Sequence, residues 1–154
     1  MPTKYQGTPA EIRALNAYIK LQRAAETVLN RTTAHLSDYG LTTSQFAALE
    51  ALYHLGTLSQ RDLAGKLLKS TGNISTVLKT MEKRGLISRV RDPADNRYNQ
   101  VCITESGQVL LESLLAKHVA GIEAEMSVLS PAEQDELGRL CRKLGLRKTG
   151  TAGA

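Results

Sequence analysis

One face of a helix predicted between about residues 70 and 83 carries side chains suited to contacting nucleic acid. Apolar residues recur at i, i+3, i+4 and i+7 and predict the buried face: Ile74, Val77, Leu78 and Met81. The opposite face is small, polar and basic, and it lacks Glu: Gly72, Asn73, Thr76, Lys79, Thr80 and Lys83. Amide, hydroxyl and ammonium groups on a narrow helix suit the base edges and phosphates of a DNA major groove.

Individual roles follow from side-chain chemistry. Asn73 can pair bidentately with adenine, and Lys79 can reach guanine or a phosphate. Phosphates or thymine methyls suit Thr71, Ser75 and Thr76. Gly72 allows a close approach of the backbone, the alternative being that it is simply tolerated near the helix start. The residues expected to contact DNA are Ser59, Ser70, Thr71, Gly72, Asn73, Ser75, Thr76, Lys79, Lys83, Arg91, Asp95 and Arg97.

A shorter helix precedes this one and ends in a turn near residues 68–69. Ser59 is its predicted N-cap, and Asp62 lies in the first turn, where the helix dipole favours a negative charge. Ser70 is the predicted N-cap of the second helix, and Gly85 supplies the left-handed residue that stops it. Two short helices joined by a tight turn position the second one for docking on a duplex.

A hairpin with a projecting loop follows. Residues 86–91 and 99–103 alternate apolar and polar as half-buried strands, and the loop 92–98 between them is too long for a two-residue turn. Arg97 lies at its tip, where it suits an A/T-rich minor groove, and Asp95 can hold the guanidinium in place. The alternative is an Asp-Arg pair that only stiffens the hairpin.

The charge of the chain is concentrated in this region. Residues 57–103 hold nine Lys or Arg and four Asp or Glu, a net charge of +5, whereas the remaining residues hold eleven of each sign. A concentrated basic patch is typical of proteins that bind polyanions, because each phosphate contact releases counterions. An ordinary solvated surface with a slight basic bias is the alternative.

Five motifs in register resemble the successive signatures of the MarR family of transcription regulators. They are LTTSQF at 41–46, LSQRDLA at 58–64, MEKRGLISR at 81–89, DPADNR at 92–97 and ITESG at 103–107. The resemblance implies a winged helix-turn-helix homodimer that binds pseudo-palindromic DNA and often responds to a small ligand or an oxidant. The chain departs from the family at Asn96, where many members carry Arg, which removes one phosphate contact.

Long apolar-rich helices flank the basic region. One is expected from Pro9 to about Ser37, and a second from Gly107 to about residue 129, before a last helix that Ser130 caps. Their apolar surface exceeds what the winged region can cover, so they are expected to pack on a second subunit, the alternative being an intramolecular bundle.

We expect one mainly α domain over residues 1–154, with a small β-hairpin wing (α+β). Within it, 9–37 and 108–145 are dimerisation helices, and 41–103, opened by a capping box at Thr42 and Gln45, is the winged helix-turn-helix.

Other chemistry has little support. The chain has no Gly-rich phosphate loop, GxSxG or HExxH motif, so we expect no enzyme and no cofactor or metal. The three histidines are scattered in sequence. Cys102 is expected to be an inert core thiol, and Cys141, beside Arg142 and Lys143, is a weaker candidate for a redox switch. Two unpaired cysteines, no export signal and no membrane span predict a soluble cytoplasmic protein.

By resemblance, an effector pocket is expected where the dimerisation helices meet the winged region. Its candidates bring aromatic faces with polar tips: Tyr18, His35, Tyr39, Phe46 and Tyr53. Plain core packing is the alternative. The leading hypothesis is a dimeric transcription repressor that binds double-stranded DNA and leaves it when a small aromatic or lipophilic compound binds. The alternatives are a DNA-binding regulator with a redox or metal switch or with none, and a protein-interaction module without DNA binding.

Overall fold

The computed structural model describes residues 4–67, 71–91, 93–94 and 99–146. Its helices and strands follow in the order α1 (Pro9–Thr33), η1 (Ala34–Tyr39), α2 (Thr43–Leu55), β1 (Leu58–Ser59), α3 (Gln60–Lys66), α4 (Thr71–Lys83), β2 (Ile87–Arg91), β3 (Asn99–Ile103), α5 (Glu105–Met126) and α6 (Pro131–Gly145). The mainly α class with a small antiparallel wing is confirmed.

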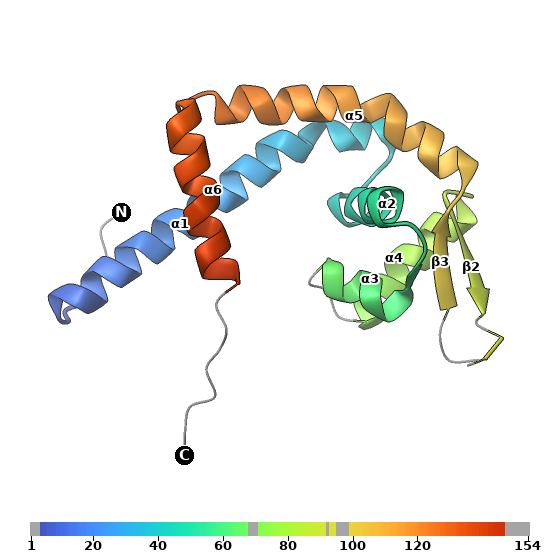
Figure 1. Cartoon of the computed structure of the whole chain (residues 1–154), viewed down its shortest axis with the longest axis horizontal. Coiled ribbons are helices and arrows are strands. Elements are labelled where there is room, and N and C mark those ends of the chain that lie inside the picture. The colour runs from blue at the N-terminus through green and yellow to red at the C-terminus, as the bar shows by residue number, and fades with distance from the viewer. Residues whose placement is uncertain (1–3, 68–70, 92, 95–98, 147–154) are drawn as a thin grey trace, which may run out of the picture.

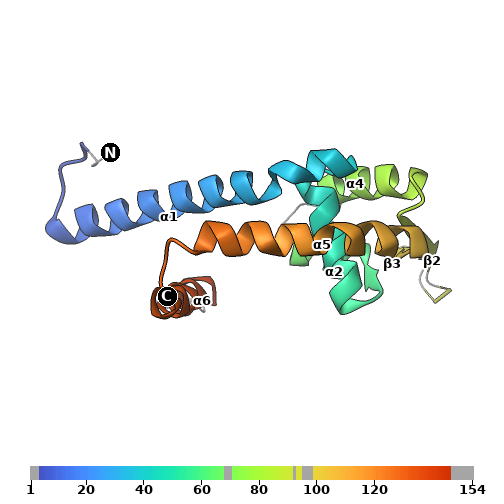
Figure 2. The same cartoon turned by 90° about the horizontal axis from the view of Figure 1, so that it is seen from above.

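The molecule has a long arm, with the small helices and the sheet below one end and α6 projecting on the same side near the other (Figure 1). α1 and α5 run side by side along the arm, and α6 crosses it at the far end (Figures 1 and 2). α2, α3, α4 and the sheet gather under the other end of α5. No helix in the described part of the chain is long and apolar enough to cross a membrane.

Side-chain caps set the starts of the helices. Thr42 and Ser130 form the predicted capping boxes with Gln45 and Glu133, and Ser59 accepts a hydrogen bond from the amide of Asp62. α5 begins at Glu105, two residues before the expected start at Gly107, because Thr104 caps it. These caps satisfy amides that the first helical turn leaves without partners.

The first long helix ends earlier than predicted. α1 stops at Thr33, and residues 34–39 form the tighter 3₁₀ helix η1, where a helix to about Ser37 was expected. Gly40 ends η1 in the left-handed conformation, with φ of 65°. Apolar spacing alone did not reveal the change, since Leu36 stays on the buried face in either helix type.

The sheet has a third strand that the sequence analysis did not predict. Its order is β1-β3-β2, with Leu58 opposite Val101 and Ile87 opposite Ile103. Val101 is fully buried, whereas Cys102 is only half-buried and its Sγ lies 3.2 Å from Oγ1 of Thr57. The expectation that Cys102 points into the core was therefore wrong, because the neighbouring residue Val101 faces the core and side chains alternate along a strand.

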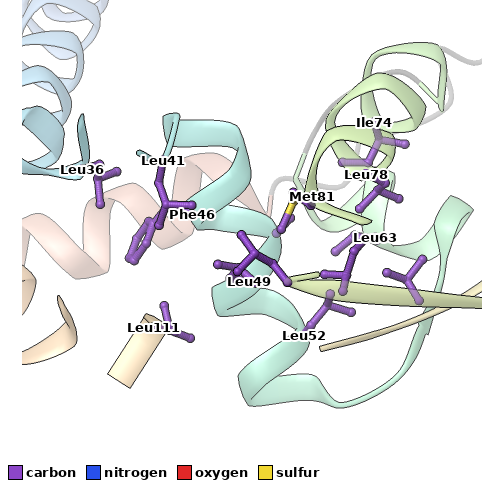
Figure 3. Close-up of a cluster of buried hydrophobic side chains, with 14 of the residues drawn as sticks. Leu36, Leu41, Phe46, Leu49, Leu52, Leu63, Ile74, Leu78, Met81 and Leu111 are labelled. Carbon is purple, nitrogen blue, oxygen red and sulfur yellow. The ribbon is translucent and has the colours of Figure 1, made fainter. Parts of the chain in front are cut away.

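A single apolar core joins the helices to the sheet. Figure 3 shows side chains of η1, α2, α3, α4 and α5 packed together. The predicted inner face of α4 is confirmed, because Ile74, Leu78 and Met81 are fully buried. The core also holds Leu36, Leu41, Phe46, Leu49, Leu52, Leu63, Val101, Leu111 and Leu114.

The far end of the arm has no comparable core. No residue of α6 is buried, and Leu144 is 62% exposed. On α5, Val109, Val119 and Ile122 face solvent, because the buried face of that helix follows Leu111 and Leu114 instead. Apolar surface in the single chain is thus concentrated on α1, α5 and α6.

Candidate nucleic-acid interface

The outer face of α4 is exposed over its described length. Asn73, Thr76, Lys79 and Lys83 lie on this face, and Ser75 is half-buried beside it. The hydroxyl of Thr80 donates to the main-chain carbonyl of Thr76, 3.2 Å away, so it is engaged within the helix. A narrow, polar and basic face next to a fully buried one has the form needed to enter a major groove.

Ser59, the first of the predicted DNA contacts, has a structural task. Its hydroxyl accepts from the amide of Asp62 at 3.0 Å and donates to the Asp62 carboxylate at 2.8 Å. Ser59 also pairs with Gln100 in the sheet. A phosphate contact by Ser59 must share a hydroxyl that already caps α3.

Two of the arginines that produce the basic charge are engaged within the chain. Arg89 of β2 forms an ion pair with Glu82 near the end of α4. Arg84 donates from Nη1 to the carbonyl of Gly40 at 2.5 Å and from Nη2 to that of Tyr39 at 3.5 Å. Exposed cations on α3 and α4 are therefore better placed for phosphates: Arg61, Lys66, Lys79 and Lys83. The predicted contacts did not include Arg61 and Lys66. Both lie off the apolar face of α3, which the sequence alone could have revealed.

The wing is described only in part. β2 is an edge strand whose last residue, Arg91, is exposed. Ser70, Asp95 and Arg97 lie outside the described residues, so their predicted contacts stay predictions. Thr71 and Gly72 form the start of α4, but their exposure is also outside what the structure describes.

Three of the five predicted effector residues come together where η1, α2 and α5 meet. The rings of His35 and Tyr39 lie edge-on, with centroids 6.4 Å apart. Phe46 reaches the same place through His118 of α5, whose ring centroid lies 4.5 Å from Phe46 and 5.2 Å from His35. The prediction missed His118, although its spacing from Leu111 and Leu114 places it on the buried face of α5.

The other two predicted effector residues lie elsewhere. The hydroxyl of Tyr53 donates to Glu112 at 3.1 Å, and this hydrogen bond and the carboxylate charge raise the pKa of Tyr53. Tyr18 lies in the N-terminal half of α1 (Pro9–Thr33), about 24 Å along the helix axis from the start of η1. There it lines a groove of about 370 Å³ between α1 and α6, with Ala14, Ala17, Leu21, Leu137, Leu140, Cys141 and Leu144.

Comparisons with known proteins agree with this geometry. The sequence model of the MarR family matches residues 41–98, which run from the start of α2 into the wing. The HTH-type transcriptional regulator MhqR of Bacillus subtilis is 32% identical over 134 residues, which cover 87% of this chain and 92% of that protein. The chain belongs to the MarR family.

Solved structures of DNA-binding proteins share its fold. BpsR of Bordetella bronchiseptica, whose DNA binding is regulated by 6-hydroxynicotinic acid, superimposes with a TM-score of 0.78 at 26% identity, over 84% of this chain and 98% of that chain. Sco3205, a MarR family regulator of Streptomyces coelicolor solved in complex with DNA, gives a TM-score of 0.81 at 21% identity, over 97% of this chain and 96% of that chain. As a member of the MarR family with this fold, the protein is a winged helix-turn-helix transcription regulator rather than an enzyme.

Proposed function

We propose that this MarR-family regulator binds an inverted-repeat operator as a homodimer and represses transcription until a small aromatic or otherwise lipophilic effector releases it. The observation that carries the proposal is the two-sided α4. Ile74, Leu78 and Met81 fix its inner face in the core, and Asn73 and Lys79 stand on its outer face. A rigidly held helix with an exposed polar face can present the same groups to every operator it meets.

The dimer is argued from apolar surface. In the single chain, large apolar side chains on α1, α5 and α6 are exposed: Leu21, Leu29, Val119, Ile122, Leu137, Leu140 and Leu144. Four of these leucines line the groove between α1 and α6, and exposed apolar surface that gathers in this way marks protein interfaces. A second copy that covers these helices would relate the two α4 helices by a two-fold axis. For such a dimer, half-sites lie about one helical turn, roughly 10 bp, apart.

Release by an effector is argued from the junction of η1, α2 and α5. His35 and Tyr39 offer aromatic faces with polar tips, and Phe46 an aromatic face, between the helices of the arm and the winged region. An aromatic acid regulates DNA binding by BpsR, a structural relative. A redox switch through Cys141 is the second candidate, since this thiol is exposed and lines the groove between α1 and α6.

The proposal is tested by footprinting on the DNA upstream of the regulator's own coding sequence. A dimer should protect two symmetric half-sites whose centres lie about 10 bp apart. Addition of candidate phenols and aromatic acids should reduce protection, and a promoter fused to a reporter should become more active when the regulator is absent. Protection of a single asymmetric half-site would refute the symmetric dimer, and lower promoter activity without the regulator would refute repression.

A further inference from the structure

Two histidines from distant parts of the chain lie against each other where η1 meets α5. His35 belongs to η1 and His118 to α5, and their ring centroids are 5.2 Å apart at an interplanar angle of 40°. His118 is only 7% exposed and rests on Phe46. Together these ring contacts join η1, α5 and α2.

Each ring has a buried nitrogen with no hydrogen-bond partner among the described residues. These atoms are Nε2 of His35 and Nδ1 of His118. A neutral imidazole needs only one donor and one acceptor, whereas an imidazolium presents two N–H donors and a positive charge. An unpaired buried charge is far costlier than an unpaired buried acceptor. The observed arrangement therefore favours a neutral ring at His118, the more deeply buried of the two.

The charged groups around the pair do not reverse this preference. Burial lowers the pKa of His118 below its ordinary value of 6.5, and His35 lowers it further. Glu50 of α2 and the main chain of Thr32 act in the opposite direction but are weaker. Asp38 of η1 and Lys117 of α5 also flank the junction, but they pair with each other 3.7 Å apart on its exposed side.

Hydrogen bonds connect this junction to the end of α4, the helix proposed to read the operator. η1, which carries His35, ends at Tyr39 and Gly40. The guanidinium of Arg84, directly after α4, donates to the carbonyls of both residues, with the shorter bond of 2.5 Å to Gly40. Because Gly40 has no Cβ, the guanidinium approaches closely; an added Cβ would lie 3.3 Å from Nη2. A displacement of η1 must therefore break these bonds or move the end of α4.

We propose that the His35–His118 pair is a proton-sensitive element whose protonation in mild acid separates η1 from α5, and that Arg84 transmits this movement to α4 and weakens operator binding. This inference rests on operator binding as proposed above. It assigns a regulatory input that needs no small-molecule effector. A proton entering the pair charges one ring beside another, and separation of the rings lets water reach the new charge.

The test measures operator affinity by fluorescence anisotropy between about pH 8 and about pH 5.5 at constant ionic strength, over the range in which circular dichroism shows an unchanged fold. The wild-type affinity should fall by about fivefold or more toward the acid end of this range, because the separated state takes up a proton that the closed pair excludes. His35→Gln and His118→Gln should each remove most of this dependence. His54→Gln is the matched control, because His54 is the third histidine and is exposed at the end of α2. It should keep the wild-type response.

Arg84→Met tests transmission separately. It keeps the aliphatic stem but removes the guanidinium, so NMR should show His118 titrating as in the wild type while operator affinity no longer follows pH. The folded-state pKa of His118 is the depressed one. As pH falls below 6.5, the unfolded chain therefore takes up the proton first, and wild-type stability should decline through that window but less so in His118→Gln.

The outcomes separate this inference from the proposed function. Absence of operator binding at about pH 8 overturns both. Tight binding at about pH 8 that does not change in acid, or a response that survives both glutamine substitutions, overturns the proton-sensing pair alone. A response lost in His54→Gln also overturns it. If a glutamine variant fails to fold, NMR of the wild type decides, because the His118 ring must change its protonation over the same pH range as operator affinity changes.

Discussion

Gly107 lies directly against the main-chain carbonyl of Leu86. A Cβ atom added to Gly107 would lie 2.1 Å from that oxygen. The same carbonyl accepts a hydrogen bond from the amide of Thr104 at 3.1 Å, and the hydroxyl of Thr104 donates to the carbonyl of Gly85 at 2.6 Å. The first turn of α5 is thereby fixed to the turn that follows α4, so these two helices meet with no room for a side chain.

Gly107→Ala should lower the free energy of unfolding by about 1–3 kcal/mol, because the backbone must shift to admit the methyl group. Gly121→Ala is the matched control in the same helix, since an added Cβ there meets nothing within 4 Å. It should be neutral or stabilise by about 0.5–1 kcal/mol, as expected for Gly to Ala inside a helix. Urea unfolding at equal protein concentration measures both, and equal stability of the two variants would refute the close contact.

Local signals predicted several helix ends and the buried face of α4 well. The inner face of α4, the caps at Thr42, Ser59 and Ser130, and the stop at Gly85 all depend on residues close together in the chain. β1 was missed because a strand of two residues has no periodicity of its own and forms only where Val101 and Gln100 supply a partner. The misplacement of Cys102 has the same origin, since the register of β3 is set by β1 and β2 together.

The candidate sites also differ in how much of them the sequence alone reveals. The exposed face of α4 followed from helical periodicity alone. The meeting of His35 with His118 could not be predicted, because 83 positions separate them in the sequence and only the packing of α1 on α5 brings them together. The use of Arg84 and Arg89 within the fold was equally hidden, since a count of charges does not show which cations already have partners.

The proposed dimer predicts a specific sensitivity of α6. Leu144→Glu should raise the dissociation constant of the dimer more than about tenfold, because each copy loses buried apolar area and buries a charge instead. Leu55→Glu, at an exposed position at the end of α2, is the control and should leave the dimer intact. Sedimentation velocity over a range of concentrations distinguishes them. A monomeric wild type, or a dimer indifferent to both changes, would contradict the assignment of α6 to the interface.

The wing prediction concerns Arg97, which the sequence places at the tip of the loop. Arg97→Ala should leave the thermal melt nearly unchanged, weaken operator binding by about 1–3 kcal/mol and make the salt dependence shallower by about one unit. Asp95→Ala should produce a smaller loss in the same direction. Arg13→Ala, an exposed cation on α1, serves as the control. Equal binding of Arg97→Ala and wild type at two salt concentrations would exclude the wing as a DNA contact.

The measurement that tests the reading role of α4 most directly compares Asn73→Ala with wild type on operator DNA and on unrelated DNA of equal length. Asn73 is exposed near the start of α4, and an asparagine amide can pair bidentately with adenine. If Asn73 reads a base, operator affinity should fall by about 1–3 kcal/mol while affinity for unrelated DNA is unchanged. An unchanged operator affinity, or an equal loss on both DNAs, would contradict base reading by this face of α4.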